Sequence, residues 1–241
     1  MSNSYFRFKQ FVVHQDRCAM KVGTDGVLLG SWTNVEHARR ILDIGTGTGL
    51  ISLMLAQRNP NASIVGIEID ENAAEQAKEN IRLSPFSDRI DIKQISFQEF
   101  SAKSTRKFDH LVSNPPFFID SLRSPDHTRS LARHAEKLSL EELFCDAKQV
   151  AAEHARFSVI IPYLQKRRIL FAASDFGWHP ARITNVFSLS HSKYPKRMLI
   201  EFMNDIPDFI SENELTIEIR PKEYSPAYID LVKDFYLLSS T

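Results

Sequence analysis

The chain has little cysteine, no long apolar run and no excess of charge. Its 241 residues include two cysteines, Cys18 and Cys145, which lie far apart. This argues against a disulfide framework and fits a reduced, cytoplasmic protein. Neither cysteine has the spacing of a metal-ligand pair, so no metal is expected. A signal peptide and an apolar run of the roughly 18 residues that a membrane helix needs are also missing, so no membrane partner is expected.

The absence of net charge restricts the possible partners. Lys plus Arg and Asp plus Glu number 30 each, so no global positive field holds nucleic acid without specificity. A nucleic-acid substrate would therefore need a local basic patch. The length suits one domain with a large core, and no repeat, low-complexity stretch or linker interrupts it. We expect a monomer with a single domain over 1–241, made of an extension at 1–35 over the active face and a core at 36–241.

From residue 36 onward, short apolar runs alternate with amphipathic stretches. This alternation predicts an α/β, Rossmann-like fold: a seven-stranded, mostly parallel sheet with an antiparallel closing strand and helices on both faces. A capping box of Ser139 and Glu142 marks the clearest helix start. The expected strands are 41–45, 63–69, 90–95, 108–113 and 157–162, then an antiparallel pair at 182–189 and 197–203; the expected helices are 49–58, 71–83 and 139–155.

The two ends of the chain carry weaker patterns. Residues 5–13 alternate and predict a hairpin or a strand over the active face. Thr24 or Asp25 is expected to cap a short helix that buries Val27, Leu28 and Trp32. Residues 214–220 and 224–236 predict a last extended piece and a helix.

Three glycines at alternate positions follow the first core strand, in Asp43-Ile44-Gly45-Thr46-Gly47-Thr48-Gly49. A strand-to-helix elbow with so few side chains leaves backbone N–H groups at the helix start free to hold a polar ligand. Glu68 ends the next strand, where a doubly wound nucleotide-binding fold places the acid that binds a ribose. Without these acids, the elbow would be an ordinary tight connection.

The spacing G-x-G-x-G resembles the S-adenosylmethionine loop of Rossmann-like methyltransferases. The resemblance implies S-adenosylmethionine as the cofactor, with its ribose hydroxyls on Glu68 and its amino-acid end near Asp43 and Gly45. The full set of cofactor-binding residues that we expect is Asp43, Gly45, Thr46, Gly47, Gly49, Glu68, Ile69, Ser96, Phe97 and Asn114.

A second motif, Asn114-Pro115-Pro116-Phe117, ends the strand expected at 108–113. Consecutive prolines cannot donate ladder hydrogen bonds, so the plain structural interpretation is a rigid turn that ends the strand. In this topology, however, the stop lies beside the cofactor crevice. The Asn114 side-chain oxygen and the Pro115 carbonyl can accept hydrogen bonds from an exocyclic amine and favour its developing charge, while Phe117 stacks on the planar group. The motif, with Pro116 completing the catalytic set, predicts methylation of a planar nitrogen in a base or an amide.

These motifs belong to a wider pattern. Phe6-x-Phe8-x-Gln10-Phe11, the block Met20–Gly30, the glycine loop, Asn-Pro-Pro-Phe and Tyr224-Ser225-x-Ala227-Tyr228 together resemble the bacterial valine-tRNA adenine methyltransferases over nearly the whole chain. The resemblance implies a class I methyltransferase acting on the exocyclic N6 amine of adenosine 37, next to the anticodon, in tRNA(Val). Two positions depart from the family pattern. Phe117 stands where Tyr is frequent, and Ser96 stands where an acid often lies near the cofactor's adenine.

The partner that the resemblance implies is a tRNA anticodon stem-loop, and not DNA. A DNA-adenine or protein-glutamine methyltransferase would use the same chemistry, and a noncatalytic cofactor-binding scaffold is a third alternative. The chain shows no separate DNA-reading domain, and an intact Asn114 and Pro115 argue against the scaffold. The basic residues expected to meet RNA are Lys21, then Arg123, Arg129, Arg133 and His134 after the catalytic turn, Lys166, Arg167 and Arg168, and Lys193, Lys196 and Arg197.

Overall fold

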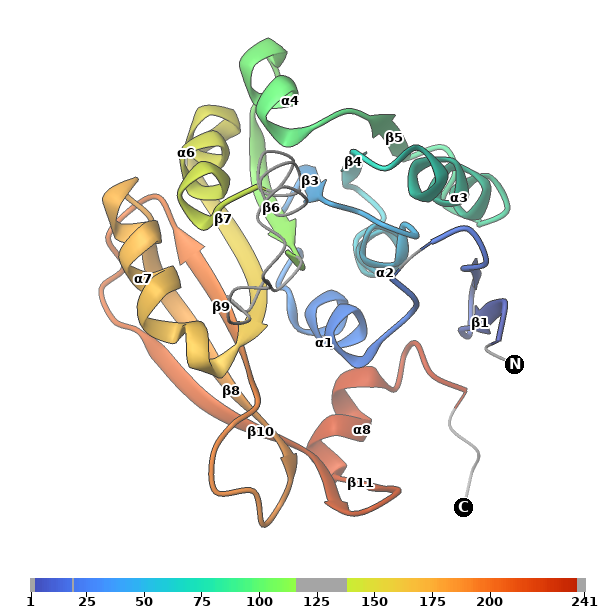
Figure 1. Ribbon diagram of the computed structural model, residues 1–241, viewed down its shortest axis with the longest axis vertical. Coiled ribbons are helices and arrows are strands. Elements are labelled where there is room, and N and C mark those ends of the chain that lie inside the picture. Colours follow the sequence, from blue (N-terminus) through green and yellow to red (C-terminus); the bar gives the residue numbers. More distant parts are fainter. Residues whose placement is uncertain (1–2, 19, 116–137, 238–241) are drawn as a thin grey trace, which may run out of the picture.

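The computed structural model describes residues 3–18, 20–115 and 138–237, and a large twisted sheet forms its centre (Figure 1). The strands of this sheet are β3 (Arg40–Ile44), β4 (Ser63–Glu68), β5 (Ile90–Gln94), β6 (Phe108–Ser113), β7 (Ala151–Pro162), β8 (His179–Leu189), β9 (Arg197–Met203), β10 (Ser211–Arg220) and β11 (Glu223–Tyr224). Within the described residues the sheet has nine strands in the order β11-β10-β8-β9-β7-β6-β3-β4-β5. Strands β3 to β7 run parallel, whereas β9 is antiparallel to both of its neighbours.

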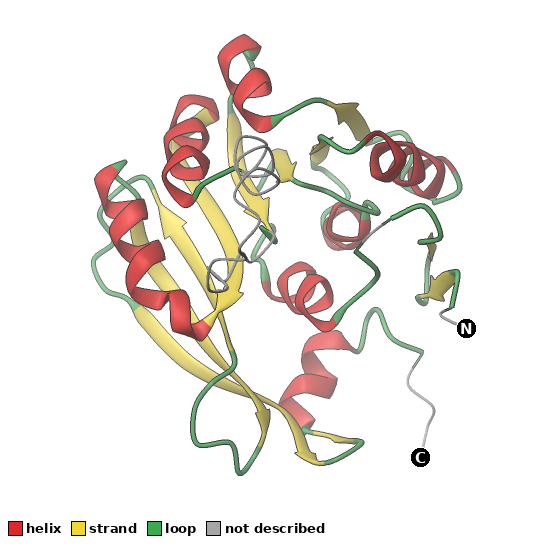
Figure 2. Ribbon diagram, in the orientation of Figure 1, coloured by secondary structure: helices red, strands yellow, loops and turns green. Residues whose placement is uncertain are grey.

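Helices cover both faces of the sheet (Figure 2). One face carries α1 (Thr24–Trp32), α2 (Leu50–Arg58), α3 (Glu71–Arg82) and α8 (Pro226–Val232), and the other carries α4 (Phe97–Lys103), α6 (Leu140–Val150) and α7 (Lys166–Asp175). A separate apolar core fills the space on each face. None of the described helices combines the length and the apolar composition needed to cross a bilayer.

The predicted α/β alternation is confirmed, with three differences. The described sheet has nine strands and not seven, because β10 and β11 extend it beyond the antiparallel pair. The helix expected at 139–155 ends at Val150, and Ala151 already pairs with Phe108 as the first residue of β7. Sheet pairing there outweighs the helix propensity of an alanine-rich stretch, which is a weak local preference. The sequence pattern also did not predict α4 and α7.

The N-terminal hairpin is confirmed as β1 (Tyr5–Arg7) paired with β2 (Val12–His14). Its Phe8 and Phe11 are buried in the core that also holds α1 and α2. The Lys9 N–H donates to the Phe235 carbonyl at 2.9 Å. The hairpin therefore packs beside α3 and the C-terminal segment, and the chain continues from it toward α1.

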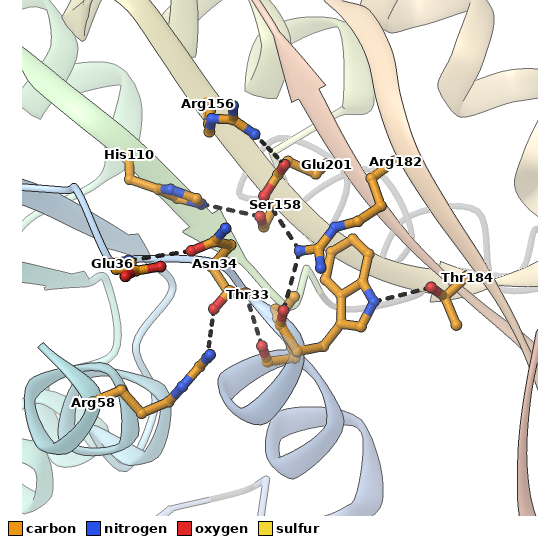
Figure 3. A network of polar contacts seen from close by, with 12 residues as sticks. Thr33, Asn34, Glu36, Arg58, His110, Arg156, Ser158, Arg182, Thr184 and Glu201 are labelled. Atoms are coloured by element: carbon orange, nitrogen blue, oxygen red, sulfur yellow. Dashed lines mark hydrogen bonds and ion pairs between the residues drawn. The ribbon is translucent and has the colours of Figure 1, made fainter. Parts of the chain in front are cut away.

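A polar network around the buried Glu201 fastens the end of α1 to the sheet (Figure 3). Glu201 of β9, whose side chain is 2% exposed, pairs with Arg156 at 2.5 Å and with Arg182 at 3.3 Å. The Arg182 guanidinium also donates to the Trp32 carbonyl at 3.0 Å and lies 3.6 Å from the centre of its ring. Trp32 donates in turn to Thr184 Oγ1 at 2.9 Å. The network fixes the position of α1, and therefore of the segment that precedes it.

Candidate active site

The glycine-rich loop between β3 and α2 has a left-handed backbone at each glycine. Gly45, Gly47 and Gly49 have φ angles of 71°, 55° and 80°, a region that residues with a Cβ rarely adopt. The N–H groups of Gly45 and Thr46 both donate to the Ile67 carbonyl at 2.9 Å, which ties the loop to β4. A Cβ at Gly45 or Gly47 would meet no described atom within 4 Å. A ligand can therefore touch the backbone at these two positions.

Asp43, near the end of β3, stabilises this loop through hydrogen bonds. Its Oδ2 accepts hydrogen bonds from Thr46 Oγ1 at 2.6 Å, from Ser52 Oγ at 2.7 Å and from the Ser52 N–H at 3.1 Å. Its Oδ1 is buried and has no hydrogen-bond partner among the described residues. Burial raises the pKa of Asp43 to about 6, although the hydrogen bonds from Thr46 and Ser52 oppose this rise. Asp43 thus holds the loop with one oxygen and keeps acceptor capacity on the other.

Glu68 reaches the loop from the end of β4. Its Oε2 accepts from the Gly47 N–H at 2.9 Å, and its Oε1 accepts from the N–H groups of Ile69 at 2.9 Å and Asp70 at 3.0 Å. The two acids that the sequence singles out therefore both accept hydrogen bonds from the glycine loop. Since each carboxylate oxygen can accept more than one hydrogen bond, Glu68 retains capacity for ribose hydroxyls.

Asn80 of α3 is a supporting residue that the sequence pattern did not reveal. Its side chain is fully buried, and its Nδ2 donates to the carbonyls of Thr48 and His14, each at 2.9 Å. Its Oδ1 accepts from the His14 N–H at 2.8 Å. The available signal was an amide placed beside alanines on the apolar side of a helix. Asn80 connects the glycine loop with the N-terminal hairpin.

Strand β6 brings Asn114 to the same place. Ser113 Oγ donates to the Ile44 carbonyl at 2.9 Å, which fixes the end of β6 against the end of β3. Asn114 and Pro115 are half-buried, and Pro116 and Phe117 lie outside the described residues. Asn114 lines a cavity of about 270 Å³ together with the glycine loop. The other lining residues are Met20, Lys21, Val22, Gly23, Thr24, Asp25, Gly26, Gly45, Thr46, Gly47, Thr48, Leu50, Ile51 and Arg197.

Close packing of α1 on α2 places the N-terminal block at this cavity. A Cβ on Gly26 would lie 3.0 Å from Leu50 Cδ2, and a Cβ on Gly30 would lie 2.7 Å from Met54 Sδ. These two glycines, one helical turn apart, allow the two helices to approach closely. The family-like block Met20–Gly30 therefore has two roles: its first residues line the cavity, and its glycines pack against α2.

Asp25 does not cap α1, and neither does Thr24, contrary to the prediction. The N-cap is Gly23, with no side-chain cap hydrogen bond. Asp25 instead forms an ion pair with Arg197 at the start of β9. Burial raises the pKa of Asp25, and the neighbouring Arg197 opposes this rise. The pair joins the N-terminal block to the β8–β9 turn, so Arg197, which was predicted to meet RNA, is engaged within the chain.

Six of the predicted cofactor residues do not line this cavity: Asp43, Gly49 and Glu68, which belong to the loop or contact it, and Ile69, Ser96 and Phe97. Ser96 Oγ accepts from the Glu99 N–H at 3.2 Å as the N-cap of α4. Phe97 is 5% exposed in the core that α4 shares with α6, and Ile69 is 57% exposed. Their contacts with a cofactor stay a prediction.

The predicted RNA-binding residues divide into four groups, one of which, Lys166, Arg167 and Arg168, begins α7. Lys21 and Arg197 line the cavity. Lys193 and Lys196 are exposed in the turn between β8 and β9. Arg123, Arg129, Arg133 and His134 lie outside the described residues.

Metal and thiol chemistry find no support in the parts of the chain that the structure describes. No group of three or more His, Cys, Asp or Glu residues there is placed to hold a metal ion. Cys18 is buried, which raises the pKa of its thiol to about 11. It is therefore a core residue and not a nucleophile.

Comparison with known proteins identifies the chemistry. The family model of the methyltransferase small domain matches residues 19–160, which include the N-terminal block, the glycine loop and Asn114. The chain is 48% identical over 238 residues to the tRNA1(Val) (adenine(37)-N6)-methyltransferase of Bacteroides thetaiotaomicron, covering 98% of this chain and 99% of that protein. The chain belongs to this methyltransferase family. A relative of the same name from Trichodesmium erythraeum is 42% identical over 241 residues, with 98% and 99% covered.

Solved structures agree on the fold of this methyltransferase. A predicted O-methyltransferase from Agrobacterium tumefaciens has a TM-score of 0.70 at 20% identity, covering 88% of this chain and 96% of that one. A geranyl diphosphate methyltransferase in complex with GPP and sinefungin has a TM-score of 0.52 at 12% identity, covering 74% and 75%. The methyltransferase therefore has the class I fold that the resemblance implied.

The cofactor of this methyltransferase is S-adenosylmethionine, and the residues present fit it. The backbone at Gly45 and Gly47 faces open space, as a closely approaching ligand requires. The buried Asp43 Oδ1 has no hydrogen-bond partner in the described part of the chain, although Asp43 does not itself line the cavity.

Proposed function

We propose that this chain transfers a methyl group from S-adenosylmethionine to the N6 amine of adenosine 37 in tRNA(Val). One observation carries the proposal: Asn114, at the end of β6, lines the same cavity as the glycine loop. The relatives named for this reaction match nearly the whole chain, including the N-terminal block that forms the cavity wall. A tRNA substrate also implies that the reaction takes place in the cytoplasm.

The loop and its two acids hold the cofactor in this proposal. Bound S-adenosylmethionine supplies an electrophilic methyl group on a sulfonium. We assign its amino-acid end to the backbone of Gly45–Gly49 and to Asp43, and its ribose hydroxyls to Glu68. Because a hydrogen bond to a charged acceptor contributes about 1.5–3 kcal/mol, Glu68→Gln should weaken cofactor binding measurably in calorimetry. Unchanged affinity would remove Glu68 from the site.

Asn114 and Pro115 orient the substrate amine. The adenine amine is a poor nucleophile because its lone pair is delocalised into the ring. The Asn114 Oδ1 and the Pro115 carbonyl accept hydrogen bonds from its two hydrogens, which favours the charge that develops on nitrogen during attack. Phe117, assigned from sequence alone, stacks on the base. Since adenosine 37 is normally stacked in the anticodon loop, it must flip out to reach the cavity.

Asn114→Ala tests the catalytic assignment. We expect the single-turnover rate of tRNA methylation to fall by about a hundredfold or more, with melting temperature and cofactor affinity preserved, because the variant removes one preorganised hydrogen bond to the transition state. Ser113→Ala is the matched control. It removes the hydrogen bond to the Ile44 carbonyl, so it should lower stability but leave the rate per folded molecule near that of the wild type.

Two results would contradict this assignment. A stable Asn114→Ala protein that methylates tRNA at the wild-type rate would mean that Asn114 has no catalytic role and only ends a strand. The choice of substrate is tested separately, with total tRNA, duplex DNA and a glutamine-containing peptide offered to the wild-type protein and the modified nucleoside then mapped. Methylation of DNA or peptide in place of tRNA would replace the proposed function by one of its alternatives.

A further inference from the structure

The balanced total charge of this chain conceals a strong local imbalance. Residues 154–200 contain eight Lys and Arg but a single acid, Asp175, whereas the whole chain contains 30 of each sign. This stretch therefore carries a net charge of +7, and the rest of the chain carries −7. Where the cations of this stretch gather on one surface without acids beside them, a neutral protein can attract a polyanion to that surface.

Two parts of this basic stretch meet at the edge of the sheet that holds Asn114. Pro162, the last residue of β7, pairs with Arg197, the first residue of β9. The chain continues from Pro162 into the 3₁₀ turn η1 (Tyr163–Gln165) and α7, and the Tyr163 N–H donates to the Lys196 carbonyl at 3.2 Å. Arg197 lines the cavity together with Asn114. Residues 163–168 and 191–196 thus form one continuous rim next to the cavity, here called the edge surface.

Only some of the cations in the stretch are available to a partner. Arg156 and Arg182 pair with the buried Glu201, and Arg197 pairs with Asp25. Lys166 Nζ lies 3.3 Å from Glu212 Oε1. The four cations that are exposed on the edge surface are Arg167, Arg168, Lys193 and Lys196.

Exposed apolar side chains lie among these cations. Tyr194 is 67% exposed, and Lys193 Nζ lies 5.5 Å from the centre of its ring. Leu164 is 96% exposed. Cations interleaved with an aromatic ring are typical of surfaces that bind RNA, because phosphates pair with the cations and a base stacks on the ring.

We propose that the edge surface binds the phosphate backbone of the RNA substrate beside the nucleotide that enters the cavity, and that Tyr194 stacks on a neighbouring base. This inference rests on the proposed function for the identity of the RNA. The surface adjoins Asn114 through Arg197, so a strand bound along it can deliver one flipped nucleotide to the cavity.

Charge reversal with a matched control tests the inference. The variants are Lys193→Glu/Lys196→Glu and Arg167→Glu/Arg168→Glu. The control is Arg39→Glu/Arg40→Glu, an exposed pair at the amino end of β3, on the opposite edge of the sheet. All three change the total charge equally. Each edge-surface variant should weaken binding of a fluorescent anticodon stem-loop RNA by about tenfold or more, because phosphate contacts dominate affinity. The control should change it less than about twofold.

The salt dependence and kinetics give independent measurements. Removal of each phosphate contact should reduce the slope of log affinity against log salt by about 0.7–0.9. The KM for tRNA should rise, while kcat, cofactor affinity and melting temperature stay near those of the wild type. Tyr194→Ala should weaken binding and Tyr194→Phe should not. If the charge-reversal variant at Lys193 and Lys196 has a lowered melting temperature, Lys193→Gln/Lys196→Gln is measured instead, and a smaller loss of RNA affinity is expected.

The outcomes separate this inference from the proposed function. Edge-surface variants that bind the RNA as tightly as the control would overturn the inference, even when the wild type methylates tRNA normally. A wild-type protein that methylates no tRNA would overturn the proposed function, while the binding assay, which needs no turnover, would still decide whether the edge surface holds RNA.

Discussion

At the scale of single residues, the ion pair between Asp25 and Arg197 joins two parts of the cavity lining. Their side chains are only 22% and 24% exposed, and burial already raises the pKa of Asp25. Removing one partner leaves the other half-buried without its counter-charge. We therefore expect Asp25→Asn and Arg197→Gln each to destabilise the protein by about 1–3 kcal/mol, and the double variant to cost about 1–2 kcal/mol less than the sum.

Denaturant unfolding of the four proteins measures this coupling. Both single variants should also lower kcat/KM for tRNA, because the wall formed by residues 20–26 loses its tie to the β8–β9 turn. Additive effects on stability, with no coupling, would show that the two side chains act independently. In that case Arg197 would return to the set of residues available to RNA.

At the scale of secondary-structure elements, the crossing of α1 and α2 positions the N-terminal block. Alanine is a better helix former than glycine by about 1 kcal/mol, but a Cβ on Gly30 would lie 2.7 Å from Met54 Sδ and 3.0 Å from Met54 Cβ. Overpacking costs about 1–3 kcal/mol. We expect Gly30→Ala to lower the free energy of unfolding by about 1–2 kcal/mol.

Gly26→Ala serves as the comparison in the same unfolding experiment. The nearest atom to its Cβ would be the movable end of Leu50, at 3.0 Å, so the helix propensity gained should offset most of the strain. Gly30→Ala should therefore be the less stable of the two. The opposite order of stability would mean that close packing of α1 on α2 does not determine the stability of this block.

At the scale of the whole molecule, buried ionisable groups make stability depend on pH. Burial, followed by the charges of Arg156, Arg182 and Arg58, lowers the pKa of His110 to about 3. His110 Nε2 lies 3.0 Å from Ser158 Oγ in the network of Figure 3. In the unfolded chain an ordinary histidine takes up a proton near pH 6.5, whereas in the fold His110 stays neutral. The contribution of neutral His110 to the free energy of unfolding is therefore fully present above about pH 6.5 and is lost as the pH falls toward 3.

The measurable consequence is a difference between two unfolding curves. Between about pH 6 and pH 4, the wild type should lose up to about 1.4 kcal/mol per pH unit more than His110→Gln. Asp43 acts in the opposite direction, because its pKa is raised to about 6 in the fold, but its effect is common to both proteins and cancels in the difference. Parallel curves would mean that His110 takes up its proton in the fold as readily as in the unfolded chain.

The sequence by itself determined the features that depend on neighbouring residues. Glycines at alternate positions predict the left-handed elbow, because only glycine adopts that backbone without strain. Two prolines after Asn114 predict the end of β6, and periodicity places Glu68 at the end of β4. The parallel order of the core follows from the same alternation, since carboxyl ends of parallel strands share an edge. The sequence alone therefore predicts that Asn114 and the glycine loop lie together.

Only the tertiary structure decided the features that depend on distant partners. Asp25 pairs with Arg197 and not with its own helix end, Asn80 supports the glycine loop, and α6 gives way to β7 at Ala151. At Asp25 and at Ala151 a local preference competes with a contact from another element, and the contact wins because packing and pairing outweigh a weak propensity. The basic residues are visible in the sequence, but the register of β7 against β9 brings them to the cavity, and local sequence carries no information about that register.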